Sequence, residues 1–143
     1  MKCCTVFALV LGSAFALSSG SPQLSAQGCK DEEGMVADYK TAVTGLVETV
    51  KKESVADFGK AFHQKTVSTK LMLFGNMVDG LIDCLQKRAS DSATSKEDAD
   101  TAKGKIAASN KLKDTIKQDR DALKAAQSDK NAKALIEKFA FTG

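Results

Sequence analysis

Residues 67–85 read VSTKLMLFGNMVDGLIDCL, and this stretch shows the helical architecture of the chain most clearly. Large apolar residues recur in it at steps of three and four, at Val67, Leu71, Phe74, Val78, Leu81 and Leu85. This spacing keeps side chains on one face of a helix with ~3.6 residues per turn, whereas a half-buried strand would need strict alternation. The stretch therefore predicts a long amphipathic helix that buries one face.

The same apolar stripe extends toward the N-terminus. Three further stripe positions precede Val67, namely Val55, Phe58 and Phe62. Ser54 is suited to cap the start of this helix, because its hydroxyl can accept a hydrogen bond from an unpaired backbone amide. The stripe slips by one residue between Phe62 and Val67, which predicts a bend or a break near residues 63–66. Gly75 marks a second candidate break, since Gly costs ~1 kcal/mol against Ala inside a helix.

A second amphipathic segment lies upstream of Ser54, and its apolar residues are Met35, Tyr39, Val43, Leu46 and Val50. Their steps of three and four predict a first helix that ends near Glu53. The short turn at Ser54 makes the two helices an antiparallel hairpin. We expect the core of this hairpin, or alternatively the lining of a site for an apolar ligand, to contain Tyr39, Phe58, Phe62, Leu71, Phe74 and Val78.

The C-terminal part of the chain is more polar. Residues 89–98 contain no large apolar residue and are typical of a linker. Thr94 or Ser95 then offers a cap for a long third helix, whose apolar residues are sparse and predict a thin cover over the hairpin. They are Ile106, Leu112, Ile116 and Leu123. Ser128 precedes a short fourth amphipathic segment.

The whole pattern predicts an all-α protein, a small four-helix bundle formed by residues 34–143 as a single domain. Residues 21–33, which include the only proline, are expected to be a flexible lead-in. No window of the sequence shows convincing period-2 alternation.

Residues 1–20, MKCCTVFALVLGSAFALSSG, have the shape of a secretory signal peptide. One positive charge is followed by a short apolar run and then by small residues. The run is too short for the ~20 residues that span a bilayer, so no stable membrane span is predicted. Cleavage before Ser21 is favoured, with sites after Ala16 and Ala26 as competitors. The protein is therefore expected to be secreted and extracellular.

Removal of the signal peptide leaves two of the four cysteines, Cys29 and Cys84. Two cysteines in an oxidising compartment allow one intramolecular disulfide, and we predict this bond. The bond would join the start of the first helix to the end of the second. It therefore requires the same antiparallel arrangement as the turn at Ser54.

Residues that could carry catalysis are scarce. His63 is the only imidazole, and it lacks the nucleophile, the orienting acid and the second His that a catalytic or zinc site needs. Neither a phosphate-binding glycine loop nor a calcium loop occurs. We expect a protein that is not an enzyme and that holds no metal or cofactor.

A basic stripe runs along the third helix, formed by Lys113, Lys117, Arg120 and Lys124. Aspartates interleave with it at distances of three and four residues, and no aromatic residue lies beside it. Such a face is expected to be solvated and paired with its own helix rather than to bind nucleic acid or a membrane.

These sequence features leave two functions from different classes. The first is a protein-protein interaction, in which this chain acts as an extracellular inhibitor, effector or signalling partner through a helix face. The alternative is an extracellular carrier of a small apolar molecule, such as a lipid, in the bundle interior.

Overall fold

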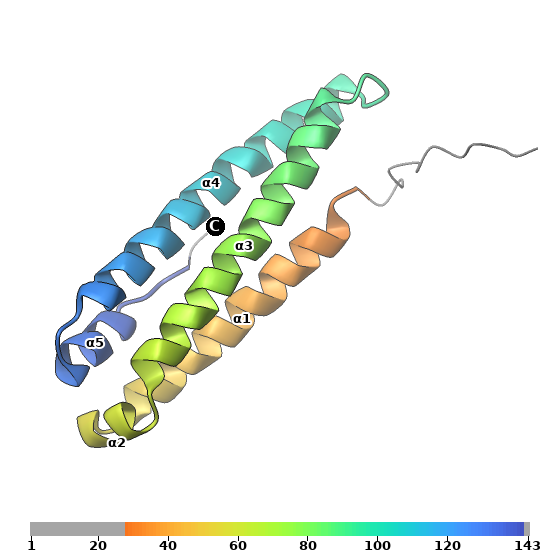
Figure 1. Ribbon diagram of the computed structural model, residues 1–143. Helices are drawn as coiled ribbons and strands as arrows, with labels where there is room; N and C mark the ends of the chain where they lie inside the picture. The colour runs from red at the N-terminus through yellow and green to blue at the C-terminus, as the bar shows by residue number, and fades with distance from the viewer. Residues whose placement is uncertain (1–27, 142–143) are drawn as a thin grey trace, which may run out of the picture.

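Five helices follow one another along residues 28–141, which are the residues that the computed structural model describes (Figure 1). They are α1 (Lys30–Lys52), α2 (Val55–Lys60), α3 (His63–Ser90), α4 (Lys96–Ala125) and α5 (Asp129–Ile136). This range contains no strand, so the all-α prediction is confirmed. The predicted signal peptide, and the lead-in before Gly28, lie outside the described residues.

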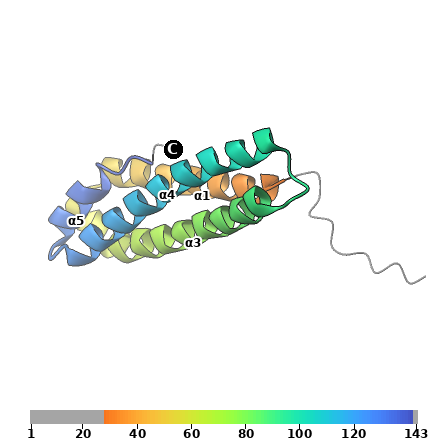
Figure 2. The same ribbon diagram turned by 90° about the horizontal axis from the view of Figure 1, so that it is seen from above.

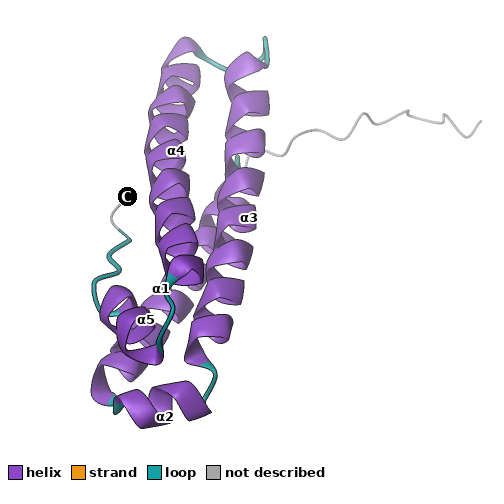
Figure 3. Cartoon of the chain, turned by 60° about the vertical axis from the view of Figure 1, so that its left-hand side comes forward, coloured by secondary structure: helices purple, strands orange, loops and turns teal. Residues whose placement is uncertain are grey.

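The three long helices run side by side, and α3 packs along both α1 and α4 (Figures 1 and 2). The short helices α2 and α5 contact each other and close the end of the molecule opposite the disulfide (Figure 3). The fold thus has one covalently closed end and one end built from two short helices.

Serine side chains start three of the helices as their sequence predicts. Ser54, Ser95 and Ser128 each accept a hydrogen bond from the backbone amide three residues later, over 3.1, 3.1 and 3.3 Å. Each bond satisfies one of the amides that a helix start leaves unpaired, which contributes about 1 kcal/mol.

The core contains most of the predicted stripe residues. Phe58, Leu71, Phe74 and Val78 are fully buried, and Tyr39 is half-buried at the edge of the same cluster. Further members come from α1, α4 and α5, namely Val43, Val47, Val50, Leu112, Ile116, Leu123 and Ile136.

The expected second helix is two helices. The break falls at Ala61 and Phe62, just before the range 63–66 that the slip in the stripe predicts, and α3 continues without a break through Gly75. The chain turns at Phe62 because this residue adopts the left-handed conformation, with φ of 52°. Phe62 consequently points away from the core, so its predicted place in the hairpin core is wrong.

The first helix begins earlier than the sequence indicates. It starts at Lys30, inside the predicted lead-in of residues 21–33. Asp31, Glu32 and Glu33 occupy its first turn, where carboxylates interact favourably with the positive end of the helix dipole. These charges extend the helix beyond its apolar stripe.

Helix α4 is a full partner of α3 rather than a thin cover. The two helices pack along most of their length, more extensively than α1 packs on α3. Small residues make this contact, because Ala102 and Ser109 are buried together with the sparse large ones. Gly75 faces Ile116 in this contact, and a Cβ atom at this position would lie 3.8 Å from Ile116, an ordinary van der Waals distance.

The chain after α5 completes the core. The fourth segment is helical only as far as Ile136, and the residues beyond it run back alongside the long helices (Figure 1). Phe141 is buried there and meets Phe74 edge-on, with ring centroids 5.6 Å apart. The apolar pattern contained no signal for this contact, because Phe141 follows the helix rather than continuing its stripe.

Candidate functional site: the α2–α3 corner

Phe62 is the most unusual residue of the described chain. It is the one residue other than glycine in this range with a positive φ, and 73% of its surface is exposed. The left-handed conformation costs an L-residue with a side chain about 1–2 kcal/mol, and an exposed phenylalanine recovers little of this by burial. Strained residues of this kind concentrate at functional sites. We call the region around Phe62 the α2–α3 corner.

A cavity of about 400 Å³ opens beside Phe62. It lies between α2, the start of α3, the end of α4 and the start of α5, and its volume is within the range of about 300–1,000 Å³ that ligand pockets have. Its lining consists of Phe58, Gly59, Phe62, His63, Gln64, Lys65, Ser68, Thr69, Leu123, Lys124 and Asp129.

Gln64 and Gly59 hold the walls of the cavity in place. The Gln64 side-chain amide donates hydrogen bonds to the carbonyl oxygens of Leu123 and Ala126, over 2.9 and 3.2 Å, and so ties the start of α3 to the end of α4. At Gly59, the space that a Cβ atom would need is filled by the Asp129 carboxylate. A side chain at this position would require the Asp129 carboxylate, at the start of α5, to shift.

His63, the single histidine of the sequence, connects the α2–α3 corner to the end of α1. The Nε2 atom of His63 lies 3.0 Å from Oε1 of Glu53, the first residue after α1, and the His63 ring packs against Phe58. The His63 side chain is only 13% exposed, and its Nδ1 atom is buried without a hydrogen-bond partner. This contact joins α1 to α3 directly beside Phe62 and fixes the direction in which α3 begins.

The cavity carries an excess of positive charge. Lys65 on α3 and Lys124 on α4 line it, and neither makes an ion pair or a hydrogen bond with another described residue. Asp129 is the one carboxylate among the lining residues. The site therefore combines an apolar wall with two unpaired ammonium groups, which favours a ligand that is apolar in part and negatively charged in part.

The predicted basic stripe does not form a single surface. Lys113 pairs with Asp79 across the contact between α4 and α3, and the hydrogen bond to Asp79 raises the pKa of Lys113. The second and third members of the stripe, Lys117 and Arg120, lie 3.5 and 3.7 Å from Asp121 of their own helix. Lys124 alone lines the cavity. Only the middle of the stripe is paired within its own helix as expected.

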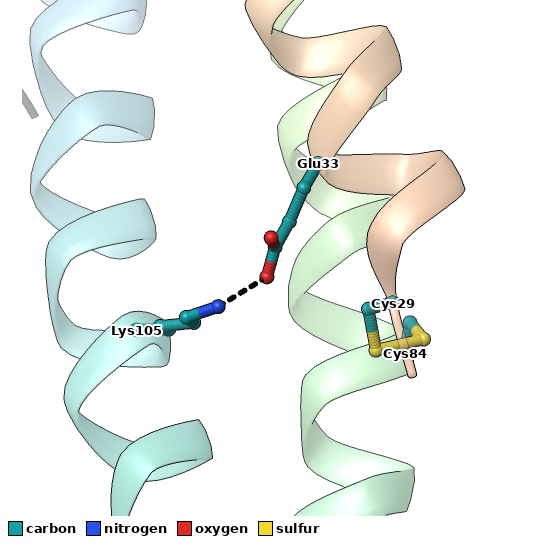
Figure 4. The surroundings of a disulfide bond; sticks show 4 residues. All are labelled: Cys29, Glu33, Cys84 and Lys105. Carbon is teal, nitrogen blue, oxygen red and sulfur yellow. Dashed lines mark hydrogen bonds and ion pairs between the residues drawn. A yellow bond between two sulfur atoms is a disulfide. The ribbon is translucent and has the colours of Figure 1, made fainter. Parts of the chain in front are cut away.

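The opposite end of the molecule is closed by a covalent bond and an ion pair. Cys29 and Cys84 form the predicted disulfide, with Cα atoms 5.9 Å apart, and Lys105 of α4 pairs with Glu33 of α1 over 2.6 Å (Figure 4). Within residues 28–141, the two cysteines and Glu32 are the only His, Cys, Asp or Glu side chains close enough together to hold a metal ion. Both sulfur atoms belong to the disulfide, so they offer no thiolate ligands.

Over the range that the structure describes, none of the helices combines the length and the apolar composition needed to cross a membrane. Comparison of the chain with protein-family models, with curated proteins and with solved structures finds no match in any of the three.

Proposed function

We propose that this chain is a small secreted helical-bundle protein that acts by binding another extracellular protein, with the α2–α3 corner as its binding surface. The observation that carries the proposal is Phe62, a strained aromatic residue that is 73% exposed beside a cavity. In this bundle α2 and α3 count as one bent element, which leaves four main helical elements.

Association would give the Phe62 side chain the burial that it lacks in the isolated chain. Complete burial of a phenylalanine contributes about 1.5–3 kcal/mol, so covering the exposed part of Phe62 would contribute about 1–2 kcal/mol. Aromatic side chains are enriched in protein interfaces, and anchors that fill pockets carry much of the binding energy. The left-handed backbone at Phe62 directs the side chain away from the core before binding, so the backbone needs no rearrangement to present the ring to a partner.

The disulfide supports the extracellular part of the proposal. Cys29 and Cys84 are bonded, and disulfides form and persist mainly in oxidising compartments. The signal-peptide pattern of residues 1–20 provides the route to such a compartment.

The packing of the interior favours an interaction protein over a carrier. Phe58, Phe74 and Leu71 are fully buried against their neighbours, and Phe141 covers Phe74 from the C-terminal segment. A ligand in the bundle interior would have to displace these side chains. The cavity at the corner, in contrast, opens to the solvent and is accessible to a partner.

Capture from the extracellular fluid of the source organism tests this proposal. The oxidised protein is immobilised as wild type, as Phe62→Gly and as Met72→Ala, which removes a different exposed apolar side chain from α3. Phe62→Gly removes the ring while the backbone keeps its left-handed turn. Bound proteins are identified by mass spectrometry, and the dissociation constant of each purified candidate is measured for all three variants.

We expect a partner that binds wild type and Met72→Ala equally well and Phe62→Gly at least tenfold more weakly. A factor of ten in the dissociation constant is about 1.4 kcal/mol, within the contribution worked out for the ring. The proposal is wrong if no captured protein binds saturably, or if Phe62→Gly binds its partner as well as wild type does.

A further inference from the structure

We infer that the α2–α3 corner recognises an acidic segment of its partner, with one apolar side chain in the cavity and flanking carboxylates on Lys65 and Lys124. This inference rests on the proposed function and names the chemistry of the partner at the same surface.

The apolar part of the inference follows from the walls of the cavity. Phe58 of α2 and Leu123 of α4 are among the lining residues and belong to the buried core, so the inner end of the cavity is apolar. Phe62 stands at the opening with most of its ring exposed. With a volume of about 400 Å³, the cavity is at the small end of ligand pockets, which suits an inserted side chain rather than a large cofactor.

The acidic part follows from the charges at the opening. Lys65 and Lys124 come from two different helices and make no ion pair or hydrogen bond with any other described residue, whereas Asp129 is the one carboxylate in the lining. His63, the third basic group of the lining, is already held by Glu53. Charge complementarity therefore favours a segment that brings carboxylates, and it disfavours a basic segment by like-charge repulsion.

The other polar side chains of the lining are either already hydrogen-bonded or uncharged. The ammonium groups of Lys65 and Lys124 are therefore the main polar contacts for the acidic segment. The Gln64 amide nitrogen already donates to two carbonyl groups at the end of α4, so it holds the wall rather than a ligand. Ser68 and Thr69 add only neutral hydroxyl groups to the lining. Specificity for an acidic segment should consequently depend on Lys65 and Lys124 together.

Selection from a displayed library of random peptides, each about 12 residues long, tests the inference. The immobilised wild-type protein selects the peptides, and each enriched peptide is then measured against two charge-reversal variants by fluorescence polarisation. The first variant is Lys65→Glu/Lys124→Glu. The matched control is Lys87→Glu/Lys111→Glu, which also reverses one exposed lysine on α3 and one on α4, away from the cavity. Circular dichroism verifies that both variants are folded.

We expect enriched peptides that carry acidic residues around one large apolar residue. Their affinity should fall at least tenfold in Lys65→Glu/Lys124→Glu, remain within twofold in the control, and weaken as the salt concentration rises. The inference is overturned if no peptide is enriched, if the enriched peptides are neutral or basic, or if both charge-reversal variants bind them equally.

The same carboxylate chemistry could come from a fatty acid, so decanoate, decanol and decyltrimethylammonium are tested as competitors. If decanoate binds in a Lys65- and Lys124-dependent manner and acidic peptides do not, the site takes a fatty acid and the inference of a protein segment is wrong. A captured partner that needs Phe62 but tolerates Lys65→Glu/Lys124→Glu would overturn this inference and leave the proposed function standing. Acidic peptides that bind as expected, with no extracellular partner that depends on Phe62, would overturn the proposed function alone.

Discussion

At residue 62 we expect the glycine variant to be more stable than the alanine variant. This is the reverse of the order found inside an ordinary helix. Inside an ordinary helix, Gly is less stable than Ala by about 0.5–1 kcal/mol, because the unfolded chain gains conformational freedom. At residue 62 the backbone has φ of 52°. This left-handed conformation costs an alanine about 1–2 kcal/mol in free energy, whereas it costs a glycine almost nothing. The two terms together leave Phe62→Gly more stable than Phe62→Ala by roughly 0.5–1 kcal/mol.

The comparison isolates the backbone, because both variants lose the same ring. Since 73% of the Phe62 surface is exposed, removal of the ring costs little in either variant. Ala42→Gly, at an exposed position inside α1, provides the control with the ordinary order, and it should be less stable than wild type by about 1 kcal/mol.

Urea denaturation of the oxidised proteins, followed by far-UV circular dichroism, measures the differences in the free energy of unfolding, and thermal melts followed in the same way give the melting temperatures. The melting temperature of Phe62→Gly should exceed that of Phe62→Ala by about 2–5 °C. If Phe62→Ala is as stable as Phe62→Gly or more so, residue 62 is not left-handed in solution, and the strain that supports a binding role for Phe62 does not exist.

Three further changes test the rest of the fold. Replacing Cys29 and Cys84 together by serine should lower the free energy of unfolding by about 4 kcal/mol in the chain-entropy model, since the bond spans 55 residues; an unchanged urea midpoint would contradict this. Phe74→Ala should lower it by about 3–5 kcal/mol, as for a large core side chain, and a loss below about 1 kcal/mol would show that the site is loosely packed. Burial raises the pKa of Asp119, so the ionised carboxylate lowers the free energy of unfolding. This loss of stability is absent at low pH and appears as the pH rises through the raised pKa. Asp119→Asn should therefore stabilise the protein on the order of 0.5 kcal/mol at about pH 7 and leave it unchanged near pH 3, as thermal melts at the two pH values would show; an equal effect at both pH values would exclude this cause.

The helices could be predicted from the sequence because their signals are local. The stripe through Leu71, Phe74 and Val78 requires only a period, and the serine caps require only a hydroxyl at the start of each helix. The disulfide followed from the two cysteines that remain after removal of the signal peptide, and the antiparallel hairpin agreed with it. All of these features depend on residues that are neighbours along the chain or on a count of one residue type.

The corner could not be predicted in the same way, because it depends on tertiary contacts. Phe62 continues the stripe of Phe58, so its period places it in the core, and only the turn of the chain into α3 moves it to the surface. Lys65 and Lys124 lie far apart in the sequence, and the packing of α3 against α4 brings them to one cavity. A slip in the stripe after Phe62 was the one sequence signal at this site, and it indicated a break without showing which residue would be exposed.

The central position of α3 determines how the molecule opens. Helix α3 contacts each of the other four helices, whereas α1 and α4 are held mainly through α3. Amide hydrogens in the middle of α3 can therefore exchange with deuterium only when the whole domain unfolds, and their protection reports the global free energy of unfolding. The amides of α2 and α5 belong to short helices at the end without the disulfide, and they can exchange through local opening. The α2 and α5 side of the corner then has a lower local stability than the α3 side, which carries Gln64 and Lys65.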